Sequence, residues 1–532
     1  MSSEKTEIGV RASRRAVIAA GVAGGGLLFA GQAGRVLAEA GSAPTIRLNP
    51  DSAERALPAL FWGYNSPAPY IPYEMPAFTP AVKALGPHFL RFPGGTVGNY
   101  YNWRSGYMEV PDAGKAGSIY REQLVHRAVP AEKRDHPKGM WVEDWNRIAR
   151  DVGANLVIEA NIETSTPEDQ AAWFADMKKK GVRSDYVEMG TEFFSAMRDD
   201  MGRKRFPDPK TAHDITKKVY DAIKPQLPSS AKVAVQSSSA LFELSRKPWP
   251  GESLPPNDYT TLQREWDWDQ ALKPEPWFDA VTMHLYPKEY ASAGENLVNR
   301  LPASAQEVFD AMLARADGGY DTAISDVVGR VPGKEIWLTE YGAFEPMQTF
   351  NGVEVHFNGL WLHQVTRELL AMMRHPQVTV SCYHALKADG TLMATFRTEG
   401  SSLKPINASA VQSWFFHASR GPGCTWQRMK IEGATQIAAN GVRPGQKYWD
   451  VEAGIFRKGA DRVLFVHNTS KTARRIDLSQ IVPSQASVSA QTIATPDLLA
   501  SLEMATPVPQ PLATKPALDV PGYSITRVTW SA

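Results

Sequence analysis

Cysteine is almost absent from this chain of 532 residues, which contains only Cys382 and Cys424. Two thiols exclude a disulfide scaffold and any zinc or iron–sulfur site built from several thiolates. The histidines show no tight metal-ligand spacing. The chain also has neither a C-x-x-C-H haem motif nor a G-x-G-x-x-G motif after an expected strand. We therefore expect no metal ion and no cofactor.

Net charge is also nearly absent, because 58 Lys and Arg against 57 Asp and Glu leave a formal charge of +1. A chain without a net electrostatic field does not attract nucleic acid or an anionic membrane surface, so neither is an expected partner. Aromatic residues are plentiful, with 20 Phe, 17 Tyr and 15 Trp. Such a composition suits a protein that stacks flat apolar faces.

Long apolar runs are lacking except near the N-terminus. A twin-arginine pattern, Arg14-Arg15, precedes a Gly-rich apolar run at residues 16–30, and Ala38-Glu39-Ala40 forms a small-x-small cleavage site. The run is shorter than the roughly 20 residues that cross a bilayer. The sequence thus predicts a Tat signal peptide over residues 1–40 and a periplasmic or secreted protein without a membrane span. A frayed basic terminus is the alternative.

Residues 59–421 alternate short apolar runs with amphipathic stretches, which is typical of βα units around a parallel sheet. Eight units in series predict an α/β fold, a (β/α)₈ TIM barrel with its active site at the carboxyl ends of the strands. Two long loops, at 104–139 and 240–276, are expected to wall a pocket, unless they are structural insertions. The expected strands lie at 59–64, 89–92, 156–160, 186–189, 233–236, 278–283, 335–339 and 378–383.

After Gly421 the helical periodicity stops, and short alternating runs predict a β-sandwich over residues 422–532. The clearest of these expected strands lie at 451–456, 463–467, 474–478 and 524–530. The segment 41–58 precedes the barrel, and we expect its residues 45–48 to add a strand to the sandwich.

Two carboxylates end strands at positions that a barrel enzyme would use. Glu192 follows the fourth expected strand, and Glu340 ends the seventh, so both side chains are expected to converge across the barrel. A retaining glycosidase needs two carboxyl groups about 5–5.5 Å apart. We expect Glu192 to be the acid/base and Glu340 the ionised nucleophile. The alternative is that each is a salt-bridged strand end.

Further polar residues follow other expected strands. His284 and Tyr286 follow the sixth strand, where they could donate hydrogen bonds to Glu340, although a lone histidine is commonly a core residue. Glu159, Asn161 and Glu163 close the third strand and could contact a sugar hydroxyl or take a capping or turn role. Tyr383 and His384, at the end of the eighth strand, are candidate platforms for a sugar.

Several motifs resemble those of family 51 α-L-arabinofuranosidases. Phe89-Leu90-Arg91-Phe92-Pro93-Gly94-Gly95, continuing to Arg104, is similar to the second-strand signature of that family. Residues 154–168 are similar to its third strand and helix start. The Glu192, His284–Tyr286 and Glu340 motifs and the tail at 520–525 follow in the order of glycoside hydrolase clan A. In that clan the acid/base ends strand four and the nucleophile ends strand seven, so the resemblance implies these roles for Glu192 and Glu340.

Three sugar-binding positions depart from the resemblance. Thr191 stands where the clan has an Asn that binds the 2-hydroxyl of the sugar, and Thr96 stands where the arabinofuranosidases have Asn. Asn65 lies in the segment where they carry a Glu. Hydrogen bonds to the 2-hydroxyl strengthen in the transition state by several kcal/mol. We therefore expect these three residues to bind a −1 sugar other than ordinary L-arabinofuranose.

The sequence favours an exported retaining glycoside hydrolase that acts on an oligosaccharide or polysaccharide by double displacement. The main alternative is a non-catalytic carbohydrate-binding protein with a degenerate barrel site, which the Thr191 position favours. A Tat-exported redox or metal enzyme is a third class, against which the missing cofactor motifs argue. The sequence leaves the oligomeric state open.

Overall fold

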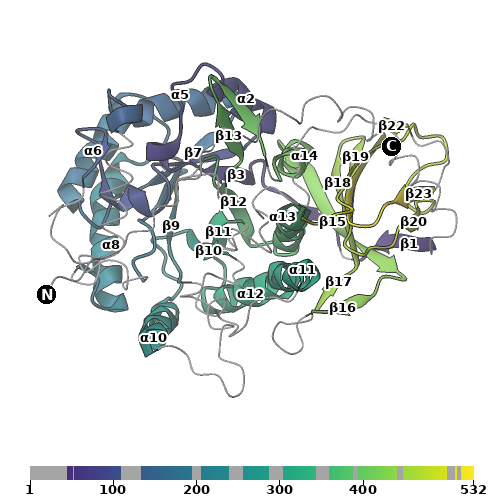
Figure 1. Ribbon diagram of the computed structural model, residues 1–532. Coiled ribbons are helices and arrows are strands. Elements are labelled where there is room, and N and C mark those ends of the chain that lie inside the picture. The colour runs from purple at the N-terminus through teal and green to yellow at the C-terminus, as the bar shows by residue number, and fades with distance from the viewer. Residues whose placement is uncertain are drawn as a thin grey trace, which may run out of the picture.

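The computed structural model describes residues 45–51, 53–109, 133–194, 205–238, 256–286, 304–342, 359–387, 394–406, 408–439, 447–499, 510–511 and 517–532. In these residues a closed parallel barrel lies beside a mostly antiparallel sheet (Figure 1). This confirms the expected fold class, a TIM barrel with a C-terminal β-sandwich. The expected signal peptide at residues 1–40 lies outside the described residues. In the described part of the chain, no helix is long and apolar enough to cross a membrane.

The barrel closes where its last strand pairs with its first, so that Tyr383 lies opposite Tyr64 and His384 opposite Asn65. The strand ends agree with the expected ones to within three residues, because each strand is a short apolar run buried on both faces. In chain order the strands are β3 (Trp62–Asn65), β4 (Phe89–Phe92), β7 (Asn155–Glu159), β8 (Tyr186–Glu188), β9 (Lys232–Gln236), β10 (Ala280–Leu285), β11 (Glu335–Tyr341) and β12 (Val378–His384).

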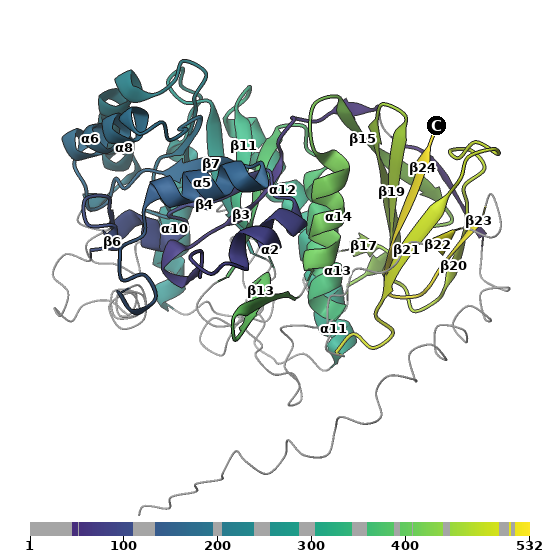
Figure 2. The ribbon, with the colours of Figure 1, turned by 90° about the horizontal axis from the view of Figure 1, so that it is seen from above.

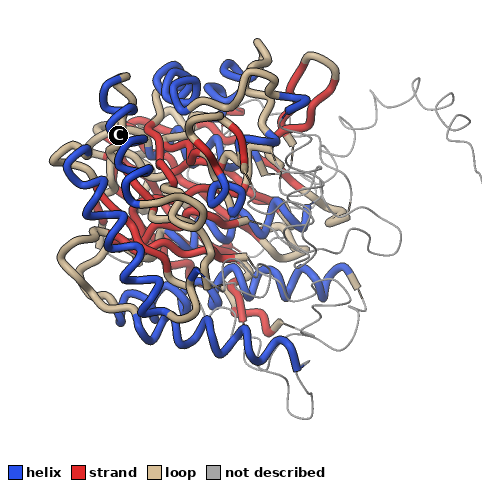
Figure 3. Tube along the Cα trace, turned by 90° about the vertical axis from the view of Figure 1, so that its left-hand side faces the viewer, coloured by secondary structure: helices blue, strands red, loops and turns tan. Residues whose placement is uncertain are grey.

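Helices surround the barrel on its outer face (Figure 3). Two of them begin with a side-chain cap followed by proline, since Thr166 accepts a hydrogen bond from the Asp169 amide and Asp208 accepts one from the Thr211 amide. The helices are α2 (Phe78–Leu85), α5 (Val142–Val152), α6 (Pro167–Lys179), α8 (Pro209–Ile223), α10 (Pro256–Ala271), α11 (Ala305–Ala314), α12 (Tyr320–Arg330), α13 (Gly359–Met372) and α14 (Ser409–Ser419).

Four of these helices, α2, α10, α12 and α14, were not expected from the sequence. Helix α10 lies within the stretch 240–276, where a long loop was expected, and it buries Trp268. Residues 239–255, including Trp249, lie outside the described residues. Helix α12 continues from α11 through one π-helical turn, η7 (Arg315–Gly319), whose paired glycines hide the helical pattern. Helix α14 is buried along most of its length, so it has little amphipathic signature.

The other long loop, at 104–139, is described only at its two ends. There β5 (Tyr101–Asn102) pairs with β6 (Tyr107–Met108), while residues 110–132 lie outside the described residues. Two further hairpins join β13 (Phe396–Glu399) to β14 (Ser402–Pro405) and β16 (Gln436–Ala438) to β17 (Lys447–Trp449).

The sandwich is a ten-stranded sheet that curls around one core. Strand β1, which precedes the barrel in the chain, pairs with β15 antiparallel and with β20 parallel. Its alternating burial sends Ile46 and Leu48 into the core that Leu464 and Val528 also fill. The strands are β1 (Thr45–Pro50), β2 (Arg55–Ala56), β15 (Cys424–Glu432), β18 (Val451–Lys458), β19 (Asp461–Asn468), β20 (Arg474–Asp477), β21 (Ser489–Ala494), β22 (Gln510–Pro511), β23 (Ala517–Val520) and β24 (Ser524–Ser531).

Helices α13 and α14 lie between the barrel and the sandwich (Figure 2). Buried charges connect the two parts. Arg367 of α13 forms an ion pair with Glu452 of β18 and lies 3.4 Å from Asp317. Arg374 contacts the same two carboxylates, at 3.1 and 2.5 Å. We call Arg367, Arg374, Glu452 and Asp317 the interface cluster.

Candidate active site

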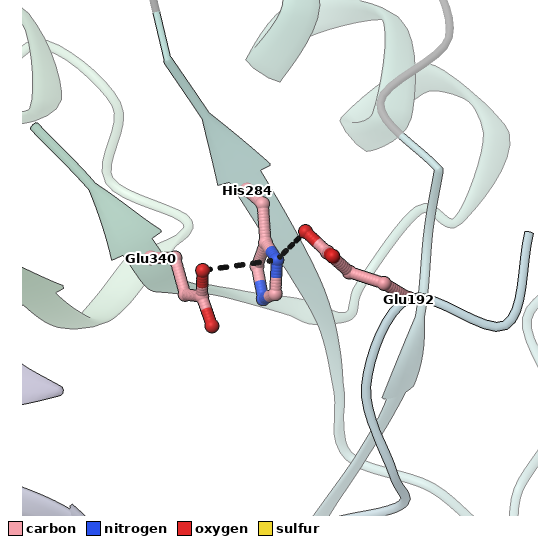
Figure 4. A group of neighbouring side chains, drawn as sticks. All are labelled: Glu192, His284 and Glu340. Atoms are coloured by element: carbon pink, nitrogen blue, oxygen red, sulfur yellow. Dashed lines mark hydrogen bonds and ion pairs between the residues drawn. The ribbon is translucent and has the colours of Figure 1, made fainter. Parts of the chain in front are cut away.

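Glu192 and Glu340 meet above the carboxyl ends of their strands, with His284 between them (Figure 4). One carboxylate oxygen of each glutamate and one ring nitrogen of His284 all lie within 4.8 Å of one another. That separation suits the pair of carboxyl groups about 5–5.5 Å apart in retaining glycosidases. It is too short for the roughly 6.5–9.5 Å that inverting glycosidases use to admit water.

Glu340 is surrounded by hydrogen-bond donors. Its Oε1 accepts from Arg91 Nη1 at 2.7 Å and from Asn65 Nδ2 at 3.1 Å, while Oε2 accepts from the Tyr286 hydroxyl at 2.6 Å. Burial alone would raise the pKa of Glu340. The neighbouring imidazoles, the Arg91 guanidinium and the Tyr286 hydroxyl instead hold it well below its ordinary value. Glu340 therefore stays ionised, as a nucleophile requires.

Glu192 sits in a more open and more strained position. Its side chain is 22% exposed, against 6% for Glu340. Its backbone φ is 56°, in the left-handed region that residues with a Cβ seldom occupy outside functional sites. Gly190, two residues earlier, has φ 70°, and a Cβ there would lie 2.0 Å from the Phe193 ring. This tight turn presents the Glu192 carboxylate to His284 and to Thr96, whose hydroxyl donates to Glu192 Oε2 at 3.2 Å.

The hydrogen bonds of His284 determine where its protons lie. The single hydroxyl hydrogen of Thr339 goes to Glu188 Oε1 at 2.8 Å, so His284 Nε2, 3.1 Å from Thr339 Oγ1, must carry a hydrogen. His284 Nδ1 then faces Glu192 Oε1 at 2.8 Å, and one proton lies between them. Burial acts to lower the pKa of His284, but the carboxylates of Glu340 and Glu192 raise it above its usual value.

His284 and Tyr286 thus divide between the two glutamates. Both residues were expected to donate hydrogen bonds to Glu340, but only Tyr286 does so. His284 Nδ1 is 3.7 Å from Glu340 and bonds Glu192 instead. A register shift between Met283 and His284 in the pairing of β10 with β11 turns the imidazole in this direction.

Asn65 and Thr96 border the carboxylates, whereas Thr191 does not reach them. Thr191 is 1% exposed, and its Oγ1 accepts from Arg91 Nη2 and donates to Glu159 Oε1, both at 2.6 Å. A threonine hydroxyl has one hydrogen, so none is left for a sugar. At the position where the clan has its sugar-binding Asn, the side chain is turned into the barrel.

Asn161 has its amide engaged within the loop that follows β7. Its Nδ2 donates to the Tyr101 carbonyl at 3.1 Å and to Thr164 Oγ1 at 2.7 Å, and its Oδ1 accepts from the Thr164 amide at 3.0 Å. Of the two roles that the sequence left open for Asn161, sugar binding and turn capping, these contacts correspond to turn capping.

Tyr383 lies in the barrel wall, 1% exposed, with its ring edge-on to Tyr64 and Tyr341. His384, the other candidate at this strand end, lies beside the carboxylates. Its Nδ1 lies 2.5 Å from Asn65 Nδ2 and 3.7 Å from Glu340 Oε2. Because side chains alternate along a strand, only one of two successive residues can face the carboxylates.

A buried charge cluster below the site was not recognised from the sequence. Arg91 contacts Glu188 at 2.6 Å, Glu340 at 2.7 Å and Glu159 at 3.4 Å. Burial, reinforced by the charges of Glu188 and Glu340, raises the pKa of Glu159 to about 8 against the opposing effect of Arg91. We call Arg91, Glu159, Glu188 and Glu340 the Arg91 cluster. Glutamates at the ends of the third, fourth and seventh expected strands were the available signal.

Among the described residues, Glu192, His284 and Glu340 are also the group with a spacing that could hold a metal ion. His284 and carboxylate oxygens are ligands that zinc accepts. In this protein these groups already share a proton and accept hydrogen bonds from Tyr286, Arg91 and Asn65, with which a metal ion would have to compete.

No protein-family model and no curated protein matches this sequence. Solved structures do match. The GH51 arabinofuranosidase from Xanthomonas axonopodis pv. citri is 14% identical with a TM-score of 0.63, over 92% of this chain and 100% of that one. A family 51 alpha-L-arabinofuranosidase from Bifidobacterium longum is 15% identical with a TM-score of 0.64, over 92% and 100% of the chains.

A family 44 xyloglucanase from Paenibacillus polymyxa is 11% identical with a TM-score of 0.55, over 92% of this chain and 99% of that one. Identities this low show the fold alone. The chain shares the fold of these structures, a barrel beside a β-sandwich.

Proposed function

We propose that this protein is a retaining glycoside hydrolase with Glu340 as nucleophile and Glu192 as acid/base. One observation carries the proposal: two carboxylates within 4.8 Å of each other have opposite surroundings. Glu340 is ringed by donors and held ionised, whereas Glu192 shares a proton with His284. Pairs of titratable groups in contrasting environments are how enzymes assign nucleophile and acid.

In the first step, the Glu340 carboxylate attacks the anomeric carbon while Glu192 gives its proton to the glycosidic oxygen, whose bond to that carbon breaks. The product is a glycosyl ester on Glu340. In the second step, Glu192 takes a proton from water, the water oxygen attacks the anomeric carbon, and the ester bond to Glu340 breaks. His284 shares that proton with Glu192 before the first step and again after the second, and it orients the Glu192 carboxyl group throughout.

The substrate is an oligosaccharide or polysaccharide whose −1 sugar is not ordinary L-arabinofuranose. The Thr191 hydroxyl accepts from Arg91 and donates its one hydrogen to Glu159, so none is left for a sugar, which supports this specificity. Without that donor, a 2-hydroxyl loses a contact that would strengthen in the transition state. Rapid cleavage of a simple L-arabinofuranoside by the pure protein would contradict the proposal.

The proposal also places the enzyme outside the cytoplasm, on the strength of the twin-arginine pattern in residues 1–40. Residues 59–421 would form the catalytic barrel and 422–532 an accessory sandwich. A carbohydrate-binding protein without turnover is the second candidate, which the missing donor at Thr191 favours. The two candidates differ in whether Glu340 is needed for bond cleavage.

The deciding experiment measures turnover of a panel of aryl glycosides, including furanosides and uronides, by the mature protein and by Glu340→Gln. We expect at least one glycoside to be cleaved, and the variant to lose about 10⁴-fold or more in kcat. Glu335→Gln is the matched control, since it changes the same strand at its far end, where Glu335 pairs with Lys232. Equal glycan binding by wild type and Glu340→Gln, without cleavage of any glycoside, would establish the binding protein instead.

A further inference from the structure

We infer that Thr191 and Glu159 form a buried positioning pair, which fixes the backbone that carries Glu192 and connects it through Arg91 to Glu340. The inference rests on the proposed function. It assigns Thr191 to the protein scaffold, although its position in the sequence suggested a contact with the sugar. Four hydrogen bonds, one small helix and one shared guanidinium support it.

Thr191 is held from both sides. Its backbone amide donates to Asn99 Oδ1 at 3.1 Å, and its carbonyl accepts from Asn99 Nδ2 at 2.7 Å. Its hydroxyl lies between Arg91 and Glu159, at 2.6 Å from each partner atom. The next residue, Glu192, has a left-handed backbone that costs about 1–3 kcal/mol and persists only where the surroundings impose it. Thr191 is the fixed point from which that strained residue projects.

Glu159 supports the short helix η3 (Thr96–Tyr100), which also contacts the acid/base. A Cβ on Gly98 would lie 2.5–2.6 Å from the Glu159 carboxyl atoms, so η3 rests directly on that carboxyl group. The same helix supplies Thr96, which donates to Glu192, and Asn99, which holds Thr191. Glu159 thereby supports Glu192 by two routes, through Thr191 and through η3.

Arg91 extends the pair to the nucleophile. Its Nη2 donates to Thr191 and its Nη1 donates to Glu340 at 2.7 Å, so both bonds fix one rigid guanidinium plane. Glu159 Oε2 already lies 3.4 Å from Arg91 Nη2. If the Thr191 hydroxyl is removed, that N–H turns toward Glu159, and the guanidinium tilts away from Glu340.

Removing the Thr191 hydroxyl tests the pair against a role in sugar binding. Thr191→Val keeps the shape and loses the hydroxyl, and Thr191→Ser keeps the hydroxyl. We expect Val to lower kcat about 10²-fold with a change in KM of less than about threefold, because sub-ångström misplacement of reacting groups costs rate more than binding. Ser should stay within a few-fold of wild type. Thr191→Val with wild-type kcat would overturn the inference.

A substrate analogue separates the two roles of Thr191 further. The glycoside found in the panel is compared with its 2-deoxy counterpart. A positioning pair predicts the same fold-loss in Thr191→Val for both compounds, since neither touches Thr191. A loss that appears in KM and vanishes with the 2-deoxy compound would assign Thr191 to the sugar and overturn the inference.

The other member of the pair provides a second comparison, which keeps the test valid if Thr191→Val does not fold. Glu159→Gln retains an acceptor for Thr191 and the bulk beneath η3, so kcat should stay near wild type at neutral pH. Glu159→Ala removes both and should lower kcat about as much as Thr191→Val. Equal kcat in Glu159→Ala and Glu159→Gln would overturn the inference.

Crystal structures of wild type, Thr191→Val and Thr191→Ser distinguish failure of the inference from failure of the proposed function. In the Val variant we expect Glu192 to leave its left-handed conformation and the Arg91–Glu340 bond to lengthen, with both retained in Ser. If no glycoside is cleaved but these shifts occur, the pair stands and the proposed function fails. Unchanged geometry in Val would overturn the pair whatever the activity.

Discussion

The Arg91 cluster and the interface cluster bury the same kinds of side chain for different ends. In the interface cluster, two guanidinium groups meet the carboxylates of Glu452 and Asp317, and Arg428 adds a third cation 3.5 Å from Glu452. In the Arg91 cluster, one guanidinium faces three carboxylates. The first cluster is rich in positive charge and the second in negative charge.

This difference determines how the groups ionise. Burial acts against the ionised form of Glu452, yet its arginine neighbours keep the pKa of that carboxyl below its ordinary value. In the Arg91 cluster, the pKa of Glu340 falls while that of Glu159 rises to about 8. A cluster with enough counter-charge, such as the interface cluster, keeps Glu452 ionised and joins two parts of the fold. A cluster with too little counter-charge drives the pKa values of its carboxyl groups apart, as a catalytic pair of acid and nucleophile requires.

Removing the central cation of each cluster should give the largest loss of stability in one case and of turnover in the other. Arg367→Met breaks the buried ion pair with Glu452 while Arg374 still contacts both carboxylates, so it should lower the free energy of unfolding by about 3 kcal/mol, the lower end for a broken buried pair. The folded fraction should keep wild-type turnover, since Arg367 lies between barrel and sandwich. Arg91→Met should reduce kcat by about 10²–10³-fold even in fully folded protein, because Glu340 loses a charged donor.

Denaturant unfolding and turnover per folded molecule measure both variants. The stability loss in Arg91→Met should be smaller than in Arg367→Met, because the carboxylates of an over-negative cluster can take up protons. An Arg91→Met variant with normal kcat would show that the comparison between the clusters is wrong.

The contributions of Glu159 and Glu452 to stability should change with pH in opposite directions. Glu159 holds a proton in the folded state up to about pH 8 that the unfolded chain releases near pH 4.5, so its contribution to stability falls as pH rises between these values. Glu452 behaves oppositely, and its stabilisation is present above its ordinary pKa and is lost on acidification.

Glu159→Gln should therefore gain stability relative to wild type as the pH rises from 5 to about 9. Glu452→Gln should be least stable relative to wild type near neutral pH and approach it in acid. Unfolding curves across this pH range test both signs. Parallel curves for wild type and Glu159→Gln would contradict an unusual titration of Glu159.

Substituting a glycine beside each cluster should give the smallest changes in stability. Gly98→Ala drives a methyl group into the Glu159 carboxyl and should cost about 1–3 kcal/mol of stability with a drop in turnover. Gly318→Ala, next to Asp317, meets no atom within 4 Å and lies in a helical turn. It should stabilise the protein by about 0.5–1 kcal/mol. Thermal unfolding compares the two, and equal effects would mean that η3 is free to shift.

Much of the fold followed from local patterns. The eight barrel strands are short apolar runs with breaks between them, so the sequence predicted each one to within three residues. Helices α10, α12 and α14 were missed because their cues are weak. The glycines of η7 interrupt α12, and α14 is buried on most sides. Such helices are stabilised by packing against neighbours, which a local pattern does not encode.

For the site, the sequence by itself determined which carboxylates end strands of a barrel, because strand order and parallel topology bring those ends to one face. The tertiary structure alone decided the partners of each side chain. His284 bonds Glu192, Thr191 turns inward to Arg91 and Glu159, and of the two candidates at the end of the eighth strand His384 faces the carboxylates. Sub-ångström positions and the balance of buried charge depend on contacts between residues far apart in the chain, which no local spacing records.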